Sequence, residues 1–158
     1  MKIVLMSHFN LAAGLKNTLG YFNPTAADQI LAISAYVDDC DPKVEFEKFL
    51  ASVDENETVL VFTDIMGGSV NQLTIPYLSR PNFYVFAGMN LGMLLQATCF
   101  MGNETADEIK ALANVGKEAV VCINDYKFEA FEEEVELFHL NEAFCFVFMY
   151  DGHVIHLG

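Results

Sequence analysis

Short apolar runs alternate along the chain with amphipathic segments, and turn residues separate the two. Four runs are nearly continuous in apolar residues, as in strands covered on both faces, and they predict strands over residues 2–6, 31–37, 58–63 and 83–87. The amphipathic segments predict helices over residues 10–22, 42–53, 69–79, 90–101 and 104–116. Strands that alternate with helices are typical of α/β proteins. We therefore predict an open, mainly parallel, doubly wound α/β sheet of order 2-1-3-4, with helices on both faces.

A further apolar run follows the last of these helices. The run Glu118–Asn124 predicts a fifth strand, and Gly116 just before it fits a helix C-cap. We therefore place the end of the α/β domain at Asn124 and assign it residues 1–124.

Residues 125–158 differ from the rest of the chain. They hold eight carboxylates and one lysine, and they also contain the strongly aromatic run 143–150. Asp151-Gly152 and the apolar residues 153–157 after it predict a hairpin turn and a return strand. Because an exposed hairpin of this kind would aggregate, we expect this acidic, aromatic extension to pack on the domain or on a partner subunit.

Composition and charge exclude several classes of protein. A chain of 158 residues with 53% apolar residues suits one domain with a full core. The net charge of −14 and the single arginine, Arg80, leave no basic stripe for nucleic-acid phosphates or an anionic membrane surface. The chain has neither a signal-peptide core nor an apolar run of bilayer-spanning length. We therefore expect a cytoplasmic protein that binds no nucleic acid and does not insert into a membrane.

The cysteines and histidines do not predict a metal site. The four cysteines form no C-x-x-C pair and fall mostly in apolar runs, as buried free thiols do. No second cluster of ligand residues accompanies them. We expect neither a metal nor a cofactor.

One histidine stands where open parallel sheets carry out ligand chemistry. His8 follows the first predicted strand and precedes the first predicted helix, at a carboxyl-terminal strand end. A lone histidine in a loop is more often an ordinary polar residue. The assignment of His8 as a nucleophile therefore needs a second motif.

That second motif follows the third predicted strand and reads Asp64-Ile65-Met66-Gly67-Gly68-Ser69. A carboxylate ends a buried strand, two glycines allow close backbone approach, and Ser69 is placed to cap the next helix. Unpaired N–H groups at a helix start form a receptor for anions. We expect a phosphoryl group to bind at Met66, Gly67, Gly68 and Ser69.

The predicted topology brings His8 and Asp64 together. In a sheet of order 2-1-3-4 the loops after strands one and three border one crevice. A carboxylate that accepts the proton of one imidazole nitrogen leaves the other nitrogen as an unprotonated nucleophile. We therefore predict His8 as the phosphorylated nucleophile and Asp64 as its imidazole partner.

These motifs carry a resemblance to a known family. The turn at Ser7-His8, the Asp64-x-x-Gly67-Gly68-Ser69 turn and the segment Ala87–Leu94 resemble the enzyme IIA component of the mannose family of the bacterial phosphoenolpyruvate:sugar phosphotransferase system. The resemblance covers about residues 1–124. It implies a phosphotransferase in which His8 accepts a phosphoryl group from the histidine-containing phosphocarrier protein and passes it to a IIB component for sugar uptake.

The resemblance also implies partners. A IIB component would connect the chain to the membrane IIC/IID permease, so the protein could be peripheral to the inner face of the membrane. The family forms homodimers that exchange a short antiparallel C-terminal strand, and Glu118–Asn124 occupies that place here.

This chain departs from the family pattern at three places. The family usually has glycine where this chain has Phe9, many members read Gly-Gly-Ser-Pro-x-Asn where this chain places Asn71 one position earlier, and residues 125–158 have no counterpart. We expect the rim of the pocket to include Ser7, Phe9, Asn71 and Asn90.

Three alternative functions stay open at this point. A phosphocarrier subunit for dihydroxyacetone kinase would use a similar histidine domain with a different acceptor. A regulatory or dimerisation module would sense phosphorylation at His8 without relaying it. A flavodoxin-like binder is disfavoured, because the loop after the first strand lacks a Ser/Thr-rich phosphate cradle and the chain has no tryptophan.

Overall fold

A four-stranded parallel sheet lies at the centre of the first of two units, Met1–Ala119 and Val120–Gly158, into which the chain divides. The structure is a computed structural model that describes residues 1–37, 39, 41–125, 147–150 and 153–156. The strands are hydrogen bonded in the order β2-β1-β3-β4, and every neighbouring pair is parallel. This order confirms the predicted fold class. The strands span β1 (Lys2–His8), β2 (Ile30–Ala35), β3 (Val59–Thr63) and β4 (Phe83–Ala87).

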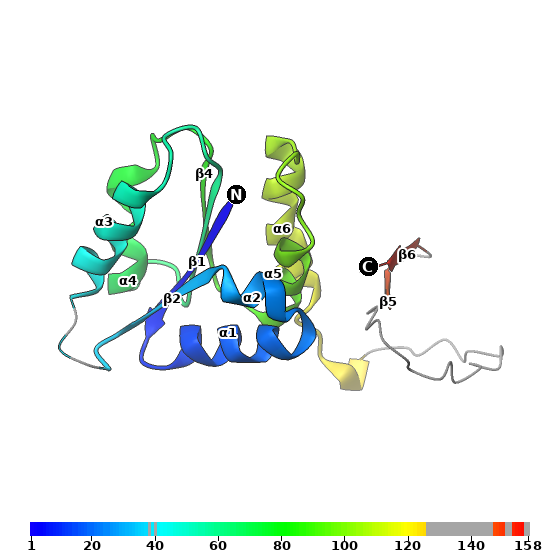
Figure 1. Ribbon diagram of the computed structural model, residues 1–158. Helices are drawn as coiled ribbons and strands as arrows, with labels where there is room; N and C mark the ends of the chain where they lie inside the picture. The colour runs from blue at the N-terminus through cyan, green and yellow to red at the C-terminus, as the bar shows by residue number, and fades with distance from the viewer. Residues whose placement is uncertain (38, 40, 126–146, 151–152, 157–158) are drawn as a thin grey trace, which may run out of the picture. The chain divides into compact units, whose positions relative to one another are not determined.

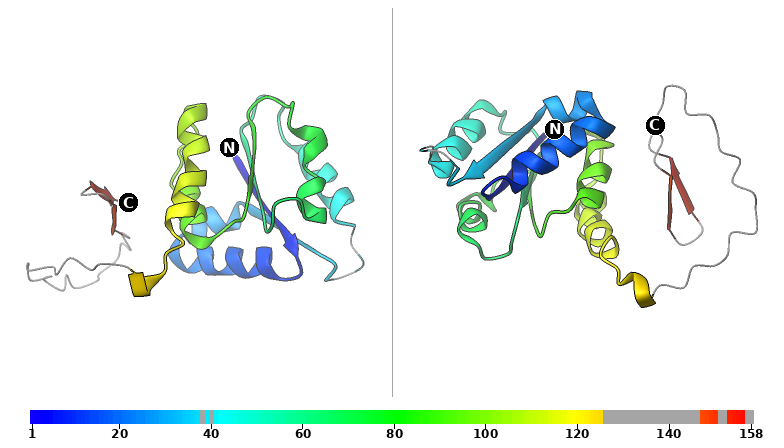
Figure 2. Two further views of the ribbon diagram at one scale, coloured as in Figure 1. Left: turned by 180° about the vertical axis from the view of Figure 1, so that it is seen from behind. Right: turned by 90° about the horizontal axis from the view of Figure 1, so that it is seen from below.

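Helices cover both faces of this sheet (Figures 1 and 2). One face carries α1 (Leu11–Phe22), α2 (Pro24–Asp28), α5 (Leu91–Thr98) and α6 (Ala106–Glu118). The other face carries α3 (Pro42–Ser52), α4 (Ser69–Gln72) and a short 3-10 helix, η1 (Ile75–Tyr77).

Successive residues of the central strands belong to two separate cores. Val4 and Met6 of β1 pack with α3 and α4, whereas Ile3 and Leu5 pack with the helices of the opposite face. All five residues of β3 are buried. Strands buried on both faces are nearly continuous in apolar residues, which explains why the sequence pattern located them so closely.

The helix predicted over residues 69–79 is broken in two. α4 ends at Gln72, and η1 begins three residues later with Pro76 in its first turn. A proline inside a helix has no N–H to donate and its ring crowds the carbonyl four residues before it, here that of Gln72. The chain therefore leaves the helix before Pro76.

Helix α2 was not predicted, although the sequence holds its start signal. Asn23 is the N-cap and its side chain accepts a hydrogen bond from the Ala26 N–H at 3.1 Å, while Pro24 takes the first helical position. Asn followed by Pro is a known start signal for a helix. The five-residue helix is too short to show the apolar periodicity on which the prediction relied.

The fifth strand predicted over Glu118–Asn124 is wrong. α6 runs to Glu118, its C-cap is Ala119, and residues 123–125 form the 3-10 helix η2 (Ile123–Asp125). Gly116 is a buried residue inside α6, not a C-cap. A strand needs a neighbour to receive its hydrogen bonds, and within the described residues neither sheet includes this segment.

The second unit contains an antiparallel strand pair where the sequence predicts a hairpin. β5 (Val147–Tyr150) pairs with β6 (His153–His156), with Tyr150 opposite His153. The predicted turn, Asp151-Gly152, and most of the acidic run lie outside the described residues. No helix in the described ranges combines the length and apolar character needed to cross a bilayer.

Two helical glycines should respond in opposite ways to substitution by alanine. At the exposed Gly14 of α1 a Cβ would meet no atom within 4 Å, so Gly14→Ala should raise the free energy of unfolding by about 0.5–1 kcal/mol. At Gly116 a Cβ would overlap Met93 Cε and lie 3.2 Å from Asn90 Nδ2, so Gly116→Ala should lower it by about 1–3 kcal/mol. Urea unfolding of the two variants measures both changes, and equal effects at the two positions would contradict the packing of α5 against α6.

Candidate active site

Three adjacent strands end at the same edge of the sheet and bring three side chains together there. His8 is the last residue of β1, Tyr36 directly follows β2, and Asp64 directly follows β3. The strand register places His8 beside Ala35 of β2, while Met6 lies beside Thr63, the last residue of β3. β1 therefore extends two residues beyond β3, and its end reaches the loop that contains Asp64.

The Asp64 carboxylate makes two hydrogen bonds with His8, one with its backbone N–H and one with its ring. Its Oδ2 accepts the backbone N–H of His8 at 2.8 Å and lies 3.0 Å from the ring Nδ1. Its Oδ1 accepts the N–H of Ile65 at 2.8 Å. The Asp64 side chain is only 12% exposed, whereas that of His8 is 39% exposed. The predicted contact between these two residues is therefore present, with the ring open to solvent and its partner enclosed.

The surroundings of Asp64 keep its carboxylate ionised. Burial acts to raise the pKa of Asp64, but the hydrogen bonds from the backbone and ring of His8 and from the N–H of Ile65 together outweigh it, so the pKa lies below its usual value. An ionised carboxylate can only accept hydrogen bonds. Nδ1 of His8 must therefore carry a proton, which leaves Nε2 of the neutral ring with a lone pair.

Ser69 contacts that second ring nitrogen. Its Oγ lies 3.0 Å from His8 Nε2 and 3.1 Å from the hydroxyl of Tyr36. The prediction that Ser69 caps the following helix is wrong: Gly68 is the N-cap of α4 and Ser69 is its first residue. The hydroxyl is therefore directed at the imidazole, while the backbone of Gly68 begins the helix.

Hydrogen bonds made by the side chains of Asn71 and Gln72 hold the turn between Asp64 and Ser69. Asn71 Oδ1 accepts the N–H of Gly67 at 3.0 Å, and Asn71 Nδ2 donates to Thr63 Oγ1 at 3.0 Å. Gln72 Nε2 donates to the carbonyl of Gly67 at 2.9 Å. Gly67 has a φ of 75°, a left-handed conformation that glycine adopts without strain. These contacts fix the position of Ser69 relative to His8.

The two glycine amides of this turn are already hydrogen bonded. The N–H of Gly67 donates to Asn71, and the N–H of Gly68 donates to the carbonyl of Ile65 at 3.2 Å. The expectation that both amides are unpaired anion donors is therefore wrong. A Cβ at Gly68 would lie 2.7 Å from Ile65 Cγ2 and 3.8 Å from His8 Cε1. Gly68 has no side chain, and this allows the turn to pass close to the imidazole.

Only one of the four predicted rim residues is exposed at the rim. Ser7 is fully buried, accepts the N–H of Ala12 at 2.7 Å and donates to the carbonyl of Phe9. Asn71 braces the turn, and Asn90 caps α5 and donates to the carbonyl of Gly116. Ser7 and Asn71 therefore hold the ends of β1 and β3, whereas Asn90 links α5 to α6. Phe9 alone extends into solvent beside His8, with 64% of its surface exposed.

Tyr36 belongs to the site but was not predicted. Its ring centroid lies 5.4 Å from that of His8, with the ring planes inclined at 37°. The available signal was its place directly after the second strand, at the same sheet edge as His8 and Asp64. A tyrosine in an apolar run is usually part of the core, so the residue type gave no reason to single it out.

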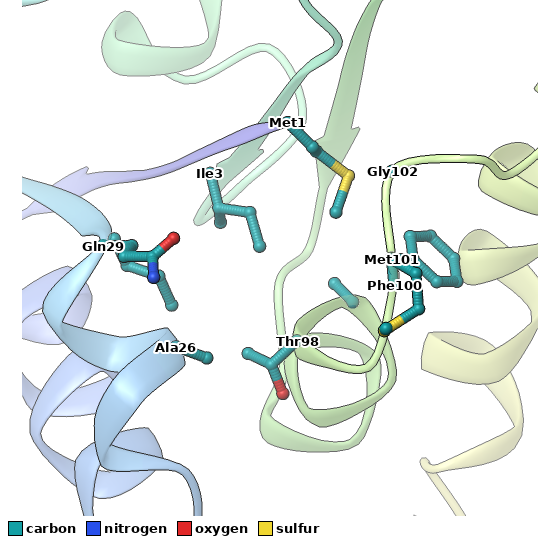
Figure 3. A pocket seen from close by; sticks show the side chains of 10 residues that line it. Met1, Ile3, Ala26, Gln29, Thr98, Phe100, Met101 and Gly102 are labelled. Carbon is teal, nitrogen blue, oxygen red and sulfur yellow. The ribbon is translucent and has the colours of Figure 1, made fainter.

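A cavity of the first unit lies away from this site (Figure 3). It encloses about 220 Å³ and is lined by residues at the starts of β1 and β2 and at the end of α5, including Ile3, Ile30 and Thr98. These strand starts are at the opposite edge of the sheet from His8. In the described part of the chain no three His, Cys, Asp or Glu side chains gather closely enough to hold a metal ion.

Comparison with known proteins identifies the family. Residues 2–114 match the family described as PTS system fructose IIA component, EIIA-man. This match covers most of the chain, and the protein therefore belongs to the mannose-family IIA components of the phosphoenolpyruvate:sugar phosphotransferase system (PTS). Proteins of this family are components of a phosphotransferase and work with a phosphocarrier and with IIB, IIC and IID components. No curated protein matches the chain.

Solved structures agree with this assignment. A protein from Klebsiella pneumoniae assigned as a phosphoenolpyruvate-dependent sugar PTS permease is 28% identical, with a TM-score of 0.69 over 78% of this chain and 91% of that chain. The mannose/sorbose specific IIA subunit from Enterococcus faecalis is 26% identical, with a TM-score of 0.65 over 80% and 96%. The EIIA component from Streptococcus agalactiae, 21% identical with a TM-score of 0.66 over 78% and 97%, shares the fold.

The structure explains why glycine suits the position after the histidine. Phe9 has a φ of 48°, in the left-handed region that costs a side-chain-bearing residue about 1–2 kcal/mol. Phe9→Gly removes this strain, whereas Phe9→Ala keeps it, and both remove the same exposed ring. We expect the glycine variant to be about 1 kcal/mol more stable than the alanine variant by chemical unfolding. An alanine variant as stable as the glycine variant would contradict the left-handed turn.

The depressed pKa of Asp64 predicts a loss of stability in acid. A carboxylate whose pKa is lower in the folded than in the unfolded chain contributes stability that is fully present above about pH 5, about one unit above its unfolded value, and is lost as the pH falls through the folded value. The difference in free energy of unfolding between wild type and Asp64→Asn should therefore shrink from about pH 5 downward. Urea unfolding at several pH values measures it, with Asp28→Asn, which alters an exposed carboxylate of α2, as the control. A difference that grows in acid would contradict the assigned direction.

Proposed function

We propose that this protein is a phosphoryl carrier that accepts a phosphoryl group on Nε2 of His8 and passes it on. The donor is the phosphohistidine of the histidine-containing phosphocarrier protein, and the acceptor is a IIB component that serves sugar uptake. The observation that carries this proposal is the state of the imidazole: Nδ1 is held by Asp64 at 3.0 Å, while Nε2 faces the exposed side of the site beside Ser69.

The transfer is a displacement at phosphorus. The Nε2 lone pair forms a new N–P bond as the N–P bond of the donor phosphohistidine breaks, and the donor imidazole leaves with the electron pair of that bond. The ring of His8 then carries positive charge, which the ionised Asp64 stabilises through Nδ1–H. In the neutral ring Asp64 holds the proton on Nδ1, so Nε2 attacks without losing a proton. Catalysis therefore consists mainly of positioning and electrostatic stabilisation.

Phosphate binding is assigned to the turn over residues 66–69. The Ser69 hydroxyl, 3.0 Å from Nε2, is close enough to turn toward an oxygen of a phosphoryl group on that nitrogen. The first N–H groups of a helix have no intrahelical acceptor, so the amide of Ser69 adds a donor beside the hydroxyl. In this proposal Gly67 and Gly68 shape the turn, and the exposed Met66 lies at its outer side.

The same reaction implies the partners and the place of action. A IIB acceptor leads to a IIC/IID permease, so the protein would act in the cytoplasm, peripheral to the inner face of the membrane. A homodimer is a further part of the proposal, as is the division into a carrier domain, residues 1–124, and an extension, residues 125–158, that packs on the domain or on the dimer.

Two alternatives use the same histidine. A phosphocarrier subunit for dihydroxyacetone kinase differs only in its acceptor, and a regulatory module would take up phosphate without passing it on. Offering the phosphorylated protein a IIB component and dihydroxyacetone kinase in parallel separates the three possibilities. Transfer to the IIB component alone supports the proposal.

The chain has four histidines, His8, His139, His153 and His156. The proposal predicts that the phosphoryl group resides on His8 alone. Incubation with phosphoenolpyruvate, enzyme I and the phosphocarrier protein, followed by mass spectrometry at alkaline pH, should show one phosphate on the wild type and none on His8→Ala. The three remaining histidines of the variant are an internal control. A His8→Ala protein phosphorylated to the wild-type extent would overturn the assignment.

A further inference from the structure

Tyr36 occupies a conformation that its own packing does not account for. Its φ is 66°, in the left-handed region that is unfavourable for a residue with a bulky side chain, and 54% of its surface is exposed. Burial therefore offsets little of the backbone strain. The contacts that Tyr36 does make are with the site: its ring lies against His8 and its hydroxyl lies 3.1 Å from Ser69 Oγ.

The chemistry of the site fixes the direction of each hydrogen bond. In the neutral ring, which is the form that can attack phosphorus, Nδ1–H donates to the ionised Asp64 and Nε2 can only accept. The hydroxyl of Ser69, 3.0 Å away, must then donate to Nε2. Its single proton is committed there, so Ser69 Oγ accepts from the hydroxyl of Tyr36. The donors run in one direction, from Tyr36 to Ser69 to Nε2.

This order gives Tyr36 a specific task. A serine hydroxyl on a solvent-exposed turn rotates freely unless a partner restricts it. A hydrogen bond donated to the serine oxygen restricts this rotation and also strengthens the hydrogen bond that the serine itself donates. We propose that Tyr36 is a positioning residue for phosphoryl transfer at His8, which acts through Ser69 by holding its hydroxyl on the Nε2 side of the ring. This inference rests on the proposed function of His8.

A Ser69 hydroxyl held in this position assists both the acceptance and the donation of a phosphoryl group by His8. Before transfer it lies 3.0 Å from Nε2, at the side of the ring where the N–P bond is to form. When the phosphoryl group arrives, the Ser69 hydroxyl leaves Nε2 and donates to a phosphoryl oxygen, and its hydrogen bond with Tyr36 keeps it at that side. Without the tyrosine hydroxyl, Ser69 must be ordered during each transfer.

The test is a double-mutant cycle with Tyr36→Phe and Ser69→Ala. Tyr36→Phe keeps the ring against His8 and removes only the hydroxyl, and it should slow phosphoryl acceptance by about threefold to tenfold, the range that one hydrogen bond supplies. In the Ser69→Ala background the same change should have no effect, because Tyr36 acts through Ser69. Tyr21→Phe, which removes a hydroxyl from an exposed tyrosine of α1, is the matched control and should transfer at the wild-type rate.

A readout that does not depend on transfer distinguishes this inference from the proposed function. The ¹⁵N resonance of His8 Nε2 should move in Tyr36→Phe, and should be insensitive to that change when Ser69 is alanine, while the melting temperature stays within about 2 °C of wild type. A wild-type protein that never gains phosphate, with the ¹⁵N shift as expected, would refute the proposed function and leave the contact intact. An unchanged ¹⁵N resonance, or an equal rate loss from Tyr36→Phe with and without Ser69, would overturn the role of Tyr36.

Discussion

The Asp64 carboxylate is the contact on which the rest of the site depends. One of its oxygens accepts both the backbone N–H and the ring Nδ1–H of His8, so a single group fixes the end of β1, the orientation of the imidazole and its tautomer. Enclosure of Asp64 would favour its neutral form, but the three N–H donors around it favour the ionised form more strongly. The proton on Nδ1 follows from that balance, and in the neutral ring Nε2 then keeps the lone pair that the proposed chemistry uses.

The strand ends that form the site are held under local strain. The parallel strands β1 and β2 both turn through a left-handed residue directly after their last paired residues, Phe9 after His8 and Tyr36 after Ala35. The N–H of Phe9 still donates to the carbonyl of Ala35, and the buried hydroxyl of Ser7 bonds on both sides of the turn. Residues in such conformations persist only where the surroundings hold them, and they gather at functional sites. Here they place one aromatic ring beside the imidazole and direct another into solvent.

Three of the four residues expected at the pocket rim, Ser7, Asn71 and Asn90, instead make supporting hydrogen bonds, and only Phe9 lies at the rim. Asn71 and Asn90 use their side-chain amides on backbone groups and on Thr63, and Gly67 and Gly68 use their amides within their own turn. The group that faces Nε2 of His8 is a serine hydroxyl at the start of a four-residue helix. Because the Ser69 hydroxyl is the group that contacts Nε2 among the described residues, its orientation is important. Tyr36 is the neighbour placed to control it.

The sequence alone determined the strands, their order and the pair His8 and Asp64. Buried parallel strands are nearly continuous in apolar residues, and the topology of a doubly wound sheet brings the ends of strands one and three together whatever the conformation of the loops. The tertiary structure decided the rest, because it depends on contacts between segments distant in sequence. The run after α6 is β-prone in composition but has no strand beside it within the described residues. Whether Ser69 caps a helix or faces an imidazole depends on where β1 ends, and whether Tyr36 belongs to a core or to a site depends on a backbone angle that no local pattern encodes.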